Sequence, residues 1–196
     1  MEQYHYLSQL DPDNDFVWDH VKKFGTEFDL TIKKHGCGLC SLCMVIENLT
    51  QRSFPISEAA QMAREWNYGS SGPTICEMKV LAPVAADRFG LRFATTSDPE
   101  ELMEWLRGGG MAIAHSNGDR EGHVGILTSG KHYVAVVAAQ GEMVTILDPS
   151  LTEEKYTTPG RKEFVQVNGS TISMHYRILS EDCLGKIPQF YLFSRK

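Results

Sequence analysis

The sequence predicts a single α+β domain in which helices come first and an antiparallel sheet follows. Apolar residues recur at helical spacing through much of the first half of the chain. Short apolar runs separated by turn residues occupy most of the second half. No repeat, low-complexity tract or linker divides residues 1–196, so one domain accounts for the whole chain.

Composition restricts the class of protein. The 196 residues are 42% hydrophobic and 22% charged, which is typical of a globular domain. The net charge of −6 argues against a nucleic-acid partner, because phosphate binding requires a concentrated basic surface. No apolar run approaches the roughly 20 residues that span a bilayer, so no membrane partner is expected.

The cysteines and the N-terminus indicate the compartment. Five cysteines, three of them within seven residues, suit reduced thiols better than a disulfide framework. Residues 1–5 lack the basic and apolar regions of a signal peptide. We therefore expect a cytoplasmic protein, and the sequence carries no signal for its oligomeric state.

Helices are expected where apolar residues recur every three or four positions and capping residues precede them. Ser57 and Asp98 are candidate N-caps, and Pro83 is predicted to kink or split its helix. The predicted helices are residues 16–24, 37–49, 58–66, 75–89 and 99–106.

Strands are expected mainly after Gly108-Gly109-Gly110. Residues 133–138 and 143–147 are joined by a tight turn at Gln140–Glu142, which predicts a hairpin. The other predicted strands are residues 28–32, 111–115 and 123–127, with edge strands at 164–167 and 191–193.

One stretch organises the chemistry. It begins Gly36-Cys37-Gly38 and continues as an apolar run, so we expect a loop that turns into a buried helix at Cys37. The first N–H groups of a helix favour negative charge, and the thiolate is the reactive form of cysteine. Small flanking residues let a substrate backbone approach the sulfur. Cys37 is therefore a candidate nucleophile.

Cys40 and Cys43 follow at spacings of three and are expected to pack as small hydrophobic side chains. A metal site would combine these cysteines with Cys37 and with His35 or Cys76. The chain lacks the final Cys-Pro of the bacterial iron–sulfur pattern and the second cysteine pair of zinc ribbons. We therefore expect no metal and no cofactor.

A candidate base and orienting acid lie in the sheet half. His132 opens one predicted strand of the hairpin, and Asp148 closes the other sixteen residues later. If the strands pair, both side chains lie at the open end of the hairpin, where they can contact each other. A thiolate, an imidazole and a carboxylate form a nucleophile–base–acid triad. His115, His123 and His175 have no evident partner, and we expect core or surface roles for them.

These residues resemble a known family. The stretch from Ile32 to Met44 is similar to the nucleophile motif of the bacteriocin-processing, double-glycine-leader cysteine peptidases, and more so to their stand-alone papain-like relatives. Further points of similarity are Leu49-Thr50 and Pro55, the step Phe89-Gly90-Leu91, and the strand that begins at His132 and ends in Asp148-Pro149. The resemblance covers about residues 30–155.

The resemblance implies a papain-like cysteine peptidase fold, with a nucleophile helix packed on an antiparallel sheet. It also implies Cys37 as nucleophile, His132 as general base and acid, and Asp148 as the orienting residue. The expected partner is a peptide or another amide substrate.

Two positions depart from the family pattern. The family places a glutamine about six residues before the nucleophile as an oxyanion donor, a group whose loss costs on the order of 10²–10³ in rate. Thr31 occupies that position. We expect the backbone around Gly36, Cys37 and Gly38 to serve instead, together with the Thr31 hydroxyl or the amine of Lys33 or Lys34. Lys131 precedes His132 where glycine is usual, so it narrows the cleft or brings positive charge to it.

The leading hypothesis is therefore a thiol hydrolase that cleaves an amide bond through an acyl-enzyme. One alternative is a catalytically impaired relative that binds peptides. Another is an acyltransferase or deamidase that uses the same triad. A role as a leader peptidase is less favoured, because no transporter segment is present in the sequence.

Overall fold

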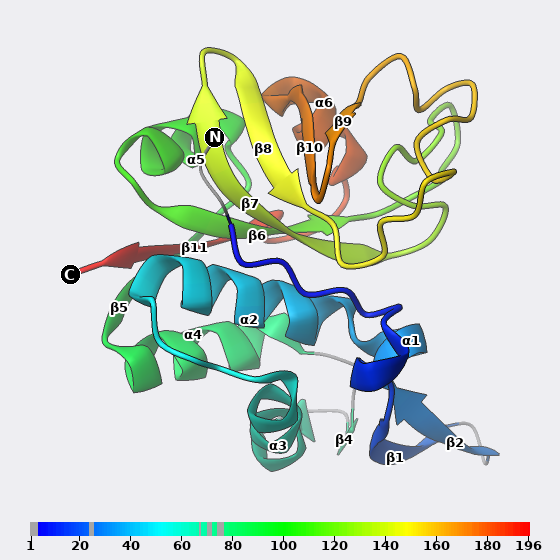
Figure 1. Ribbon diagram of the computed structural model, residues 1–196, viewed down its shortest axis with the longest axis vertical. Coiled ribbons are helices and arrows are strands. Elements are labelled where there is room, and N and C mark those ends of the chain that lie inside the picture. Colours follow the sequence, from blue (N-terminus) through cyan, green and yellow to red (C-terminus); the bar gives the residue numbers. More distant parts are fainter. Residues whose placement is uncertain (1–3, 24–25, 67, 70–71, 74–76) are drawn as a thin grey trace.

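The computed structural model describes residues 4–23, 26–66, 68–69, 72–73 and 77–196. Its helices are η1 (Pro12–Asn14), α1 (Ile32–His35), α2 (Cys37–Thr50), α3 (Ile56–Trp66), α4 (Met78–Phe89), α5 (Pro99–Arg107) and α6 (Tyr176–Asp182). Its strands are β1 (Val17–Lys23), β2 (Thr26–Thr31), β3 (Tyr68–Gly69), β4 (Gly72–Pro73), β5 (Leu91–Thr96), β6 (Met111–Ser116), β7 (His132–Gln140), β8 (Met143–Leu147), β9 (Gln166–Asn168), β10 (Thr171–His175) and β11 (Phe190–Arg195). The predicted α+β class is confirmed (Figure 1).

The main sheet divides the molecule into two lobes. Its strand order is β5-β11-β6-β7-β8-β10-β9, and every neighbouring pair is antiparallel. Helices α2, α3 and α4 lie on one side with the β1–β2 hairpin, and α5 and α6 lie on the other (Figure 1). The N-terminal segment runs between the lobes, alongside α2.

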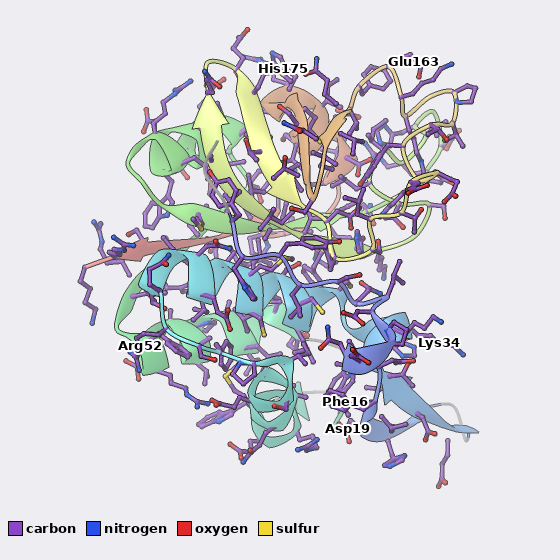
Figure 2. The ribbon with its side chains drawn as sticks, in the orientation of Figure 1. Phe16, Asp19, Lys34, Arg52, Glu163 and His175 are labelled. Atoms are coloured by element: carbon purple, nitrogen blue, oxygen red, sulfur yellow. The ribbon has the colours of Figure 1, made fainter. Side chains whose placement is uncertain are left out.

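Side chains alternate between the two faces of the sheet and build two cores, one on each side of it (Figure 2). Ile113, Ala135 and Val137 pack with α2, α3 and α4. Ala112 and Val136, one position away on the same strands, pack with α5 and α6. Because α2 is central to the first core, it is apolar on almost every side, and it packs directly on β7 and β6.

The predicted helix over residues 16–24 is wrong, because Val17–Lys23 form strand β1, paired antiparallel with β2. Phe24 lies outside the described residues. The helical spacing of its apolar residues is coincidental. Trp18 is buried while Val17 is 44% exposed, which is the alternation of a strand. The Trp18 carbonyl accepts a hydrogen bond from Arg64 Nη1 of α3 at 3.0 Å, which joins the hairpin to the helical lobe.

Other predicted elements are confirmed with shifted ends. The β7–β8 hairpin forms, and Asp98 caps α5 by accepting a hydrogen bond from the Glu100 N–H at 2.8 Å. Pro83 does not split α4, which continues through it. Ser57 lies inside α3 and is not its cap. The predicted start of α4 at Ile75 and residues 67, 70 and 71 of the predicted loop at 67–73 lie outside the described residues.

The edge position predicted for residues 191–193 is wrong. Strand β11 lies between β5 and β6, because residues 91–96, for which no strand was predicted, form the edge strand β5. The predicted edge strand at 164–167 forms only in part, as β9. Strand β10 and helix α6 were also not predicted.

The predicted strand over residues 123–127 is also wrong, because its backbone is bound by carboxylates. The N–H of Gly125 donates to Asp119 at 2.7 Å, and those of Ile126 and Leu127 donate to Asp182 at 2.6 and 3.2 Å. Asp182 is completely buried and also accepts hydrogen bonds from Ser116 Oγ at 2.7 Å and His123 Nε2 at 3.0 Å. Asp182 therefore fixes the loop that leads to His132, and His123 has a partner that the sequence did not reveal.

We predict that Asp182→Ala lowers the free energy of unfolding by about 3 kcal/mol, because it leaves buried N–H donors without an acceptor. Chemical denaturation with urea measures this. Glu181→Ala is the matched control, since Glu181 is exposed and its ion pair with Arg120 contributes less than about 1 kcal/mol. Equal effects of the two substitutions would contradict the anchoring role of Asp182.

Candidate active site

Cys37 is the first residue of α2, and a tight junction with α1 holds it there. Gly36 lies between the two helices, and its N–H donates to the Ile32 carbonyl at 2.7 Å. A Cβ atom at Gly36 would lie 2.4 Å from that carbonyl oxygen. Glycine is therefore required where α1 turns into α2, and the turn fixes the start of α2 and the position of Cys37.

The surroundings of Cys37 favour its thiolate. Burial by itself raises the pKa of the thiol. The hydrogen bond and positive charge of His132 outweigh this effect, with backbone N–H groups of Tyr133 and Gly38 adding to them, so the pKa of Cys37 is lowered. The side chain remains partly exposed. A thiolate that is stabilised and accessible is a competent nucleophile.

Cys40 and Cys43 differ from Cys37 although they share its helix. Both are completely buried, as predicted, and burial raises the pKa of each thiol well above its ordinary value. They therefore remain neutral thiols. Within the described part of the chain, no three His, Cys, Asp or Glu side chains are grouped closely enough to hold a metal ion. Cys76 lies outside the described residues.

The β7–β8 hairpin brings His132 and Asp148 together. Ala135 pairs with Leu147, so the start of β7 lies beside the end of β8. His132 Nε2 is 2.7 Å from Asp148 Oδ1, which leaves Nδ1 as the ring nitrogen available to Cys37. Burial lowers the pKa of His132, but the Asp148 hydrogen bond and the Cys37 thiolate reverse this effect and raise the pKa to about 9. Imidazolium and thiolate therefore stabilise each other.

Asp148 is the most heavily bonded group of the site, and it is completely buried. In addition to its contact with His132, its Oδ1 accepts a hydrogen bond from the Ser150 N–H at 2.9 Å. The hydroxyl Oγ of Ser150 lies 3.1 Å from the same oxygen. Its Oδ2 accepts hydrogen bonds from Lys155 Nζ at 2.5 Å and from Tyr156 Oη at 2.6 Å. Burial raises the pKa of Asp148, but His132 and then Lys155 outweigh burial and hold this pKa well below its ordinary value.

The buried Lys155 is a member of the site that the sequence did not reveal. Its ammonium group also donates to Ser150 Oγ at 2.6 Å, and only 12% of its side chain is exposed. With a thiolate and an imidazolium present, the charges of Cys37, His132, Asp148 and Lys155 sum to zero. A neutral set is less costly to bury than one with an unbalanced charge.

Thr31 and Gln9 make different contacts in the region that precedes Cys37. The Thr31 hydroxyl accepts a hydrogen bond from the Lys34 N–H at 3.3 Å, so it caps α1. Gln9 is almost fully buried, and its backbone N–H donates to the carbonyl of Pro149, the residue after Asp148, at 2.8 Å. Its side-chain Nε2 donates to the Lys33 carbonyl at 2.8 Å, and its buried Oε1 has no partner among the described residues.

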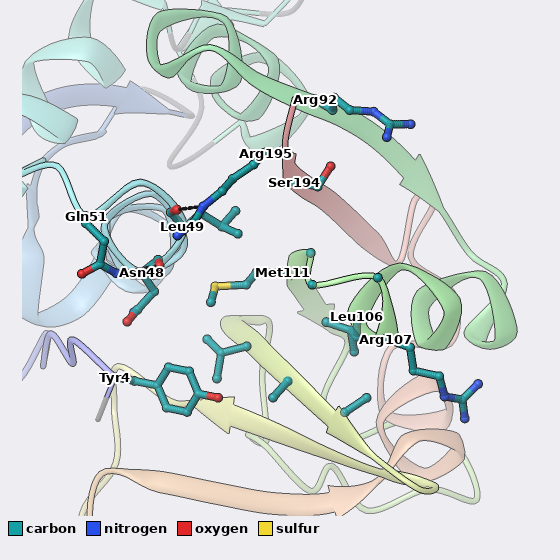
Figure 3. Close-up of a pocket in the computed structure, with 16 residues that line it drawn as sticks. Tyr4, Asn48, Leu49, Gln51, Arg92, Leu106, Arg107, Met111, Ser194 and Arg195 are labelled. Carbon is teal, nitrogen blue, oxygen red and sulfur yellow. Dashed lines mark hydrogen bonds between the residues drawn. The ribbon is translucent and has the colours of Figure 1, made fainter. Parts of the chain in front are cut away.

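A cavity of about 710 Å³ lies away from this group, at the other end of α2 (Figure 3). Asn48, Leu49 and Met111 are among the residues that line it, and Arg195 at its edge donates to the Leu49 carbonyl at 2.5 Å. Arg92 and Arg107 point outward rather than toward each other, so the cavity presents no converging charge (Figure 3). It does not contain the reactive side chains.

The helical lobe packed on an antiparallel sheet is the papain-like peptidase fold, as predicted. The fold is similar to that of a protein from Bacillus anthracis described as a C39-like peptidase, with a TM-score of 0.58 and 13% identity over 98% of this chain and 94% of that one. No family description and no curated protein sequence matches the chain. In the described part of the chain, no helix is both long and apolar enough to cross a membrane.

Two further solved structures are less similar. The peptidase domain of Streptococcus ComA, a bifunctional ABC transporter of a quorum-sensing pathway, has a TM-score of 0.49 and 13% identity, covering 91% of this chain and 99% of that domain. A double-glycine-motif protease of an AMS/PCAT transporter, in complex with its leader peptide, has a TM-score of 0.47 and 14% identity, covering 92% and 94%.

We predict that Lys155→Met lowers the free energy of unfolding by about 3 kcal/mol, because it removes one partner of a buried ion pair. Because the pKa of Asp148 is lowered in the folded protein, this carboxylate stabilises the fold above pH about 4 and less as the pH falls below that. The loss in Lys155→Met is therefore largest near neutral pH. The exposed Lys162→Met, in the same loop, is the control. Urea denaturation at pH 7 and pH 3 measures the free energy of unfolding of both variants. If Lys155→Met and Lys162→Met lower it equally at pH 7, the role of Lys155 is contradicted.

Proposed function

We propose that the protein is a papain-like cysteine peptidase or a closely related thiol hydrolase. One observation carries the proposal: a partly exposed cysteine with a lowered thiol pKa is hydrogen-bonded to a histidine whose other ring nitrogen is 2.7 Å from a buried carboxylate. This is the arrangement that nucleophilic catalysis at a carbonyl requires. The fold shared with the C39-like peptidase supports the same class.

In the proposed reaction, the Cys37 thiolate attacks the carbonyl carbon of an amide and a C–S bond forms. The imidazolium of His132 then gives its proton to the leaving nitrogen as the C–N bond breaks, which leaves an acyl-enzyme. In the second half of the reaction, His132 takes a proton from water as the water oxygen attacks the acyl carbon. The C–S bond then breaks, which releases the acid product and regenerates the thiolate. Asp148 keeps the imidazole oriented and stabilises its charged form throughout.

The tetrahedral intermediate requires hydrogen-bond donors for its oxyanion. Cys37 offers its own backbone N–H at the start of α2, where intrahelical acceptors are absent. For the second donor we propose Gln9 in preference to Thr31. The amide of Gln9 is held beside the Cys37 loop by the Lys33 carbonyl and uses one of its two N–H groups there, whereas the Thr31 hydroxyl caps α1.

The proposed nucleophile is tested by alkylation with iodoacetamide, read by intact-mass analysis. We expect one rapid modification, at Cys37, that persists at pH 6 because the thiol pKa is lowered, while Cys40 and Cys43 remain unmodified. His132→Ala is expected to slow this labelling at pH 6 by about tenfold. The wild-type protein is then incubated with a peptide library and its products are identified by mass spectrometry.

The products separate the alternatives. Cleavage that is absent from Cys37→Ala supports a peptidase, and it should decline above pH about 9, where His132 loses the proton needed by the leaving amine. Products joined to an added amine, or glutamine converted to glutamate, would instead identify an acyltransferase or a deamidase. Labelling of Cys37 no faster than that of an unfolded control would contradict all three activities.

The oxyanion donor is tested by Gln9→Ala and Thr31→Ala, compared in the same cleavage assay. We predict that Gln9→Ala reduces kcat by on the order of 10²–10³ with little change in KM, because the donor acts only on the transition state. Thr31→Ala should mainly destabilise α1 and leave kcat within about threefold of the wild type. The reverse ranking would assign the role to Thr31. Circular dichroism checks that both variants fold.

A further inference from the structure

Three lysines from separate segments bring positive charge to His115, whose strand neighbour Tyr133 is next to His132. Lys79 is in the first turn of α4, Lys131 immediately precedes His132, and Lys186 is in the loop before β11. Lys79 and Lys131 are exposed and Lys186 is half-buried. None of the three ammonium groups has an ion-pair partner among the residues that the structure describes. The protein as a whole carries a net charge of −6, so this local excess of positive charge is unusual.

Backbone pairing and ring stacking connect His115, Lys131 and the loop that bears Lys186 to Cys37. The N–H of Tyr133 donates to the Cys37 sulfur. His115 pairs with Tyr133 across β6 and β7, and the two rings stack with centroids 4.1 Å apart. The His115 N–H donates to the Gln189 carbonyl at 2.9 Å, which holds the loop bearing Lys186 against this point. Lys131 is two residues from Tyr133.

The charges of the three lysines affect His115, and that of Lys131 affects Lys186. Burial lowers the pKa of His115 to about 3, and Lys186, Lys131 and Lys79 contribute in that order. Burial lowers the pKa of Lys186 as well, and Lys131 adds to this effect. His115 is therefore neutral, and its ring can donate a hydrogen bond where the three ammonium groups supply positive charge.

The nearby carboxylates of Asp182 and Glu181 are bound to other groups. Asp182 is saturated by the loop that it anchors, and Glu181 pairs with Arg120 at 2.8 Å. Like charges held near each other repel, and an anion bound among them relieves that repulsion.

We propose that Lys79, Lys131 and Lys186, with His115, form the specificity subsite of the thiol hydrolase, and that this subsite binds a carboxylate of the peptide substrate close to the scissile bond. This inference rests on the proposed function. The carboxylate belongs either to an Asp or Glu side chain or to the free C-terminus of the substrate. In both cases the substrate is an acidic peptide, and its binding weakens as ionic strength rises.

The test uses a library of peptides derived from a digested proteome, with cleaved bonds identified by mass spectrometry. We expect Asp and Glu to be enriched by about fivefold at one position within three residues of the cleaved bond. The charge-reversal variant Lys131→Glu/Lys186→Glu should lose this enrichment and favour Lys or Arg there. Lys196→Glu is the matched control, because Lys196 is exposed at the C-terminus, beyond the other end of α2 (Figure 1).

A second library with amidated C-termini separates the two sources of carboxylate. If the C-terminal carboxylate is recognised, cleavage concentrates near peptide ends and is lost on amidation; if side chains are recognised, amidation changes nothing. Cleavage by the wild type without acidic enrichment would overturn the inference while leaving the proposed function intact. Enrichment that survives the double charge reversal would overturn it too.

A binding measurement decides the inference even without turnover. Immobilised Cys37→Ala protein is exposed to paired synthetic peptides that differ only by Glu against Gln. Preferential retention of the Glu peptides, lost at high salt and in the double charge reversal, supports the acidic subsite. Equal retention overturns it. Absence of cleavage by the wild type, in contrast, would count against the proposed function alone.

Discussion

The buried carboxylate of Asp148 is the group on which the candidate site depends. A carboxylate excluded from water is tolerated only when its oxygens are saturated by donors and its charge is balanced. The donors come from the start of β7, from the turn after β8 and from the loop that carries Lys155. The N-terminal segment joins the same point, since Tyr6 Oη donates to the Asp148 carbonyl at 2.8 Å. Segments far apart in the sequence are therefore fixed to one another by this residue.

Helix α2 illustrates how the position of a cysteine determines the pKa of its thiol. Cys37 and Cys40 are separated by less than one helical turn, yet their pKa values shift in opposite directions. Burial disfavours the thiolate of both, but only Cys37 has the hydrogen bond and positive charge of His132, together with the Tyr133 and Gly38 N–H groups, to offset that effect. The lowered thiol pKa of Cys37 is thus conferred by the junction of α1 with α2 and by the approach of β7, rather than by the cysteine-rich motif.

The sequence predicts the pairing of His132 with Asp148 because a short hairpin leaves little freedom in register, so sixteen residues of spacing become contact between strand ends. It fails where contacts between distant segments override local pattern. The apolar spacing of residues 16–24 favours a helix, but pairing with β2 makes the segment a strand. The donors to Asp148 from Lys155 and Tyr156 lie on a loop with no periodic pattern, so nothing in the sequence indicates them.

The proposed role of Gln9 illustrates the same limit at the site itself. Distance along the chain favours Thr31, six residues before Cys37, in place of the missing glutamine, because Gln9 precedes Cys37 by 28 residues. The β1–β2 hairpin accounts for the difference. Its strands run out and back, so a long excursion along the chain produces little displacement in space, and residues on either side of it remain neighbours. The Ile32 N–H donates to the Phe16 carbonyl at 3.2 Å across the base of the hairpin, which closes the excursion. Under the proposal for Gln9, the oxyanion donor comes from the far side of this hairpin, so its place beside the Cys37 loop does not require the usual sequence spacing.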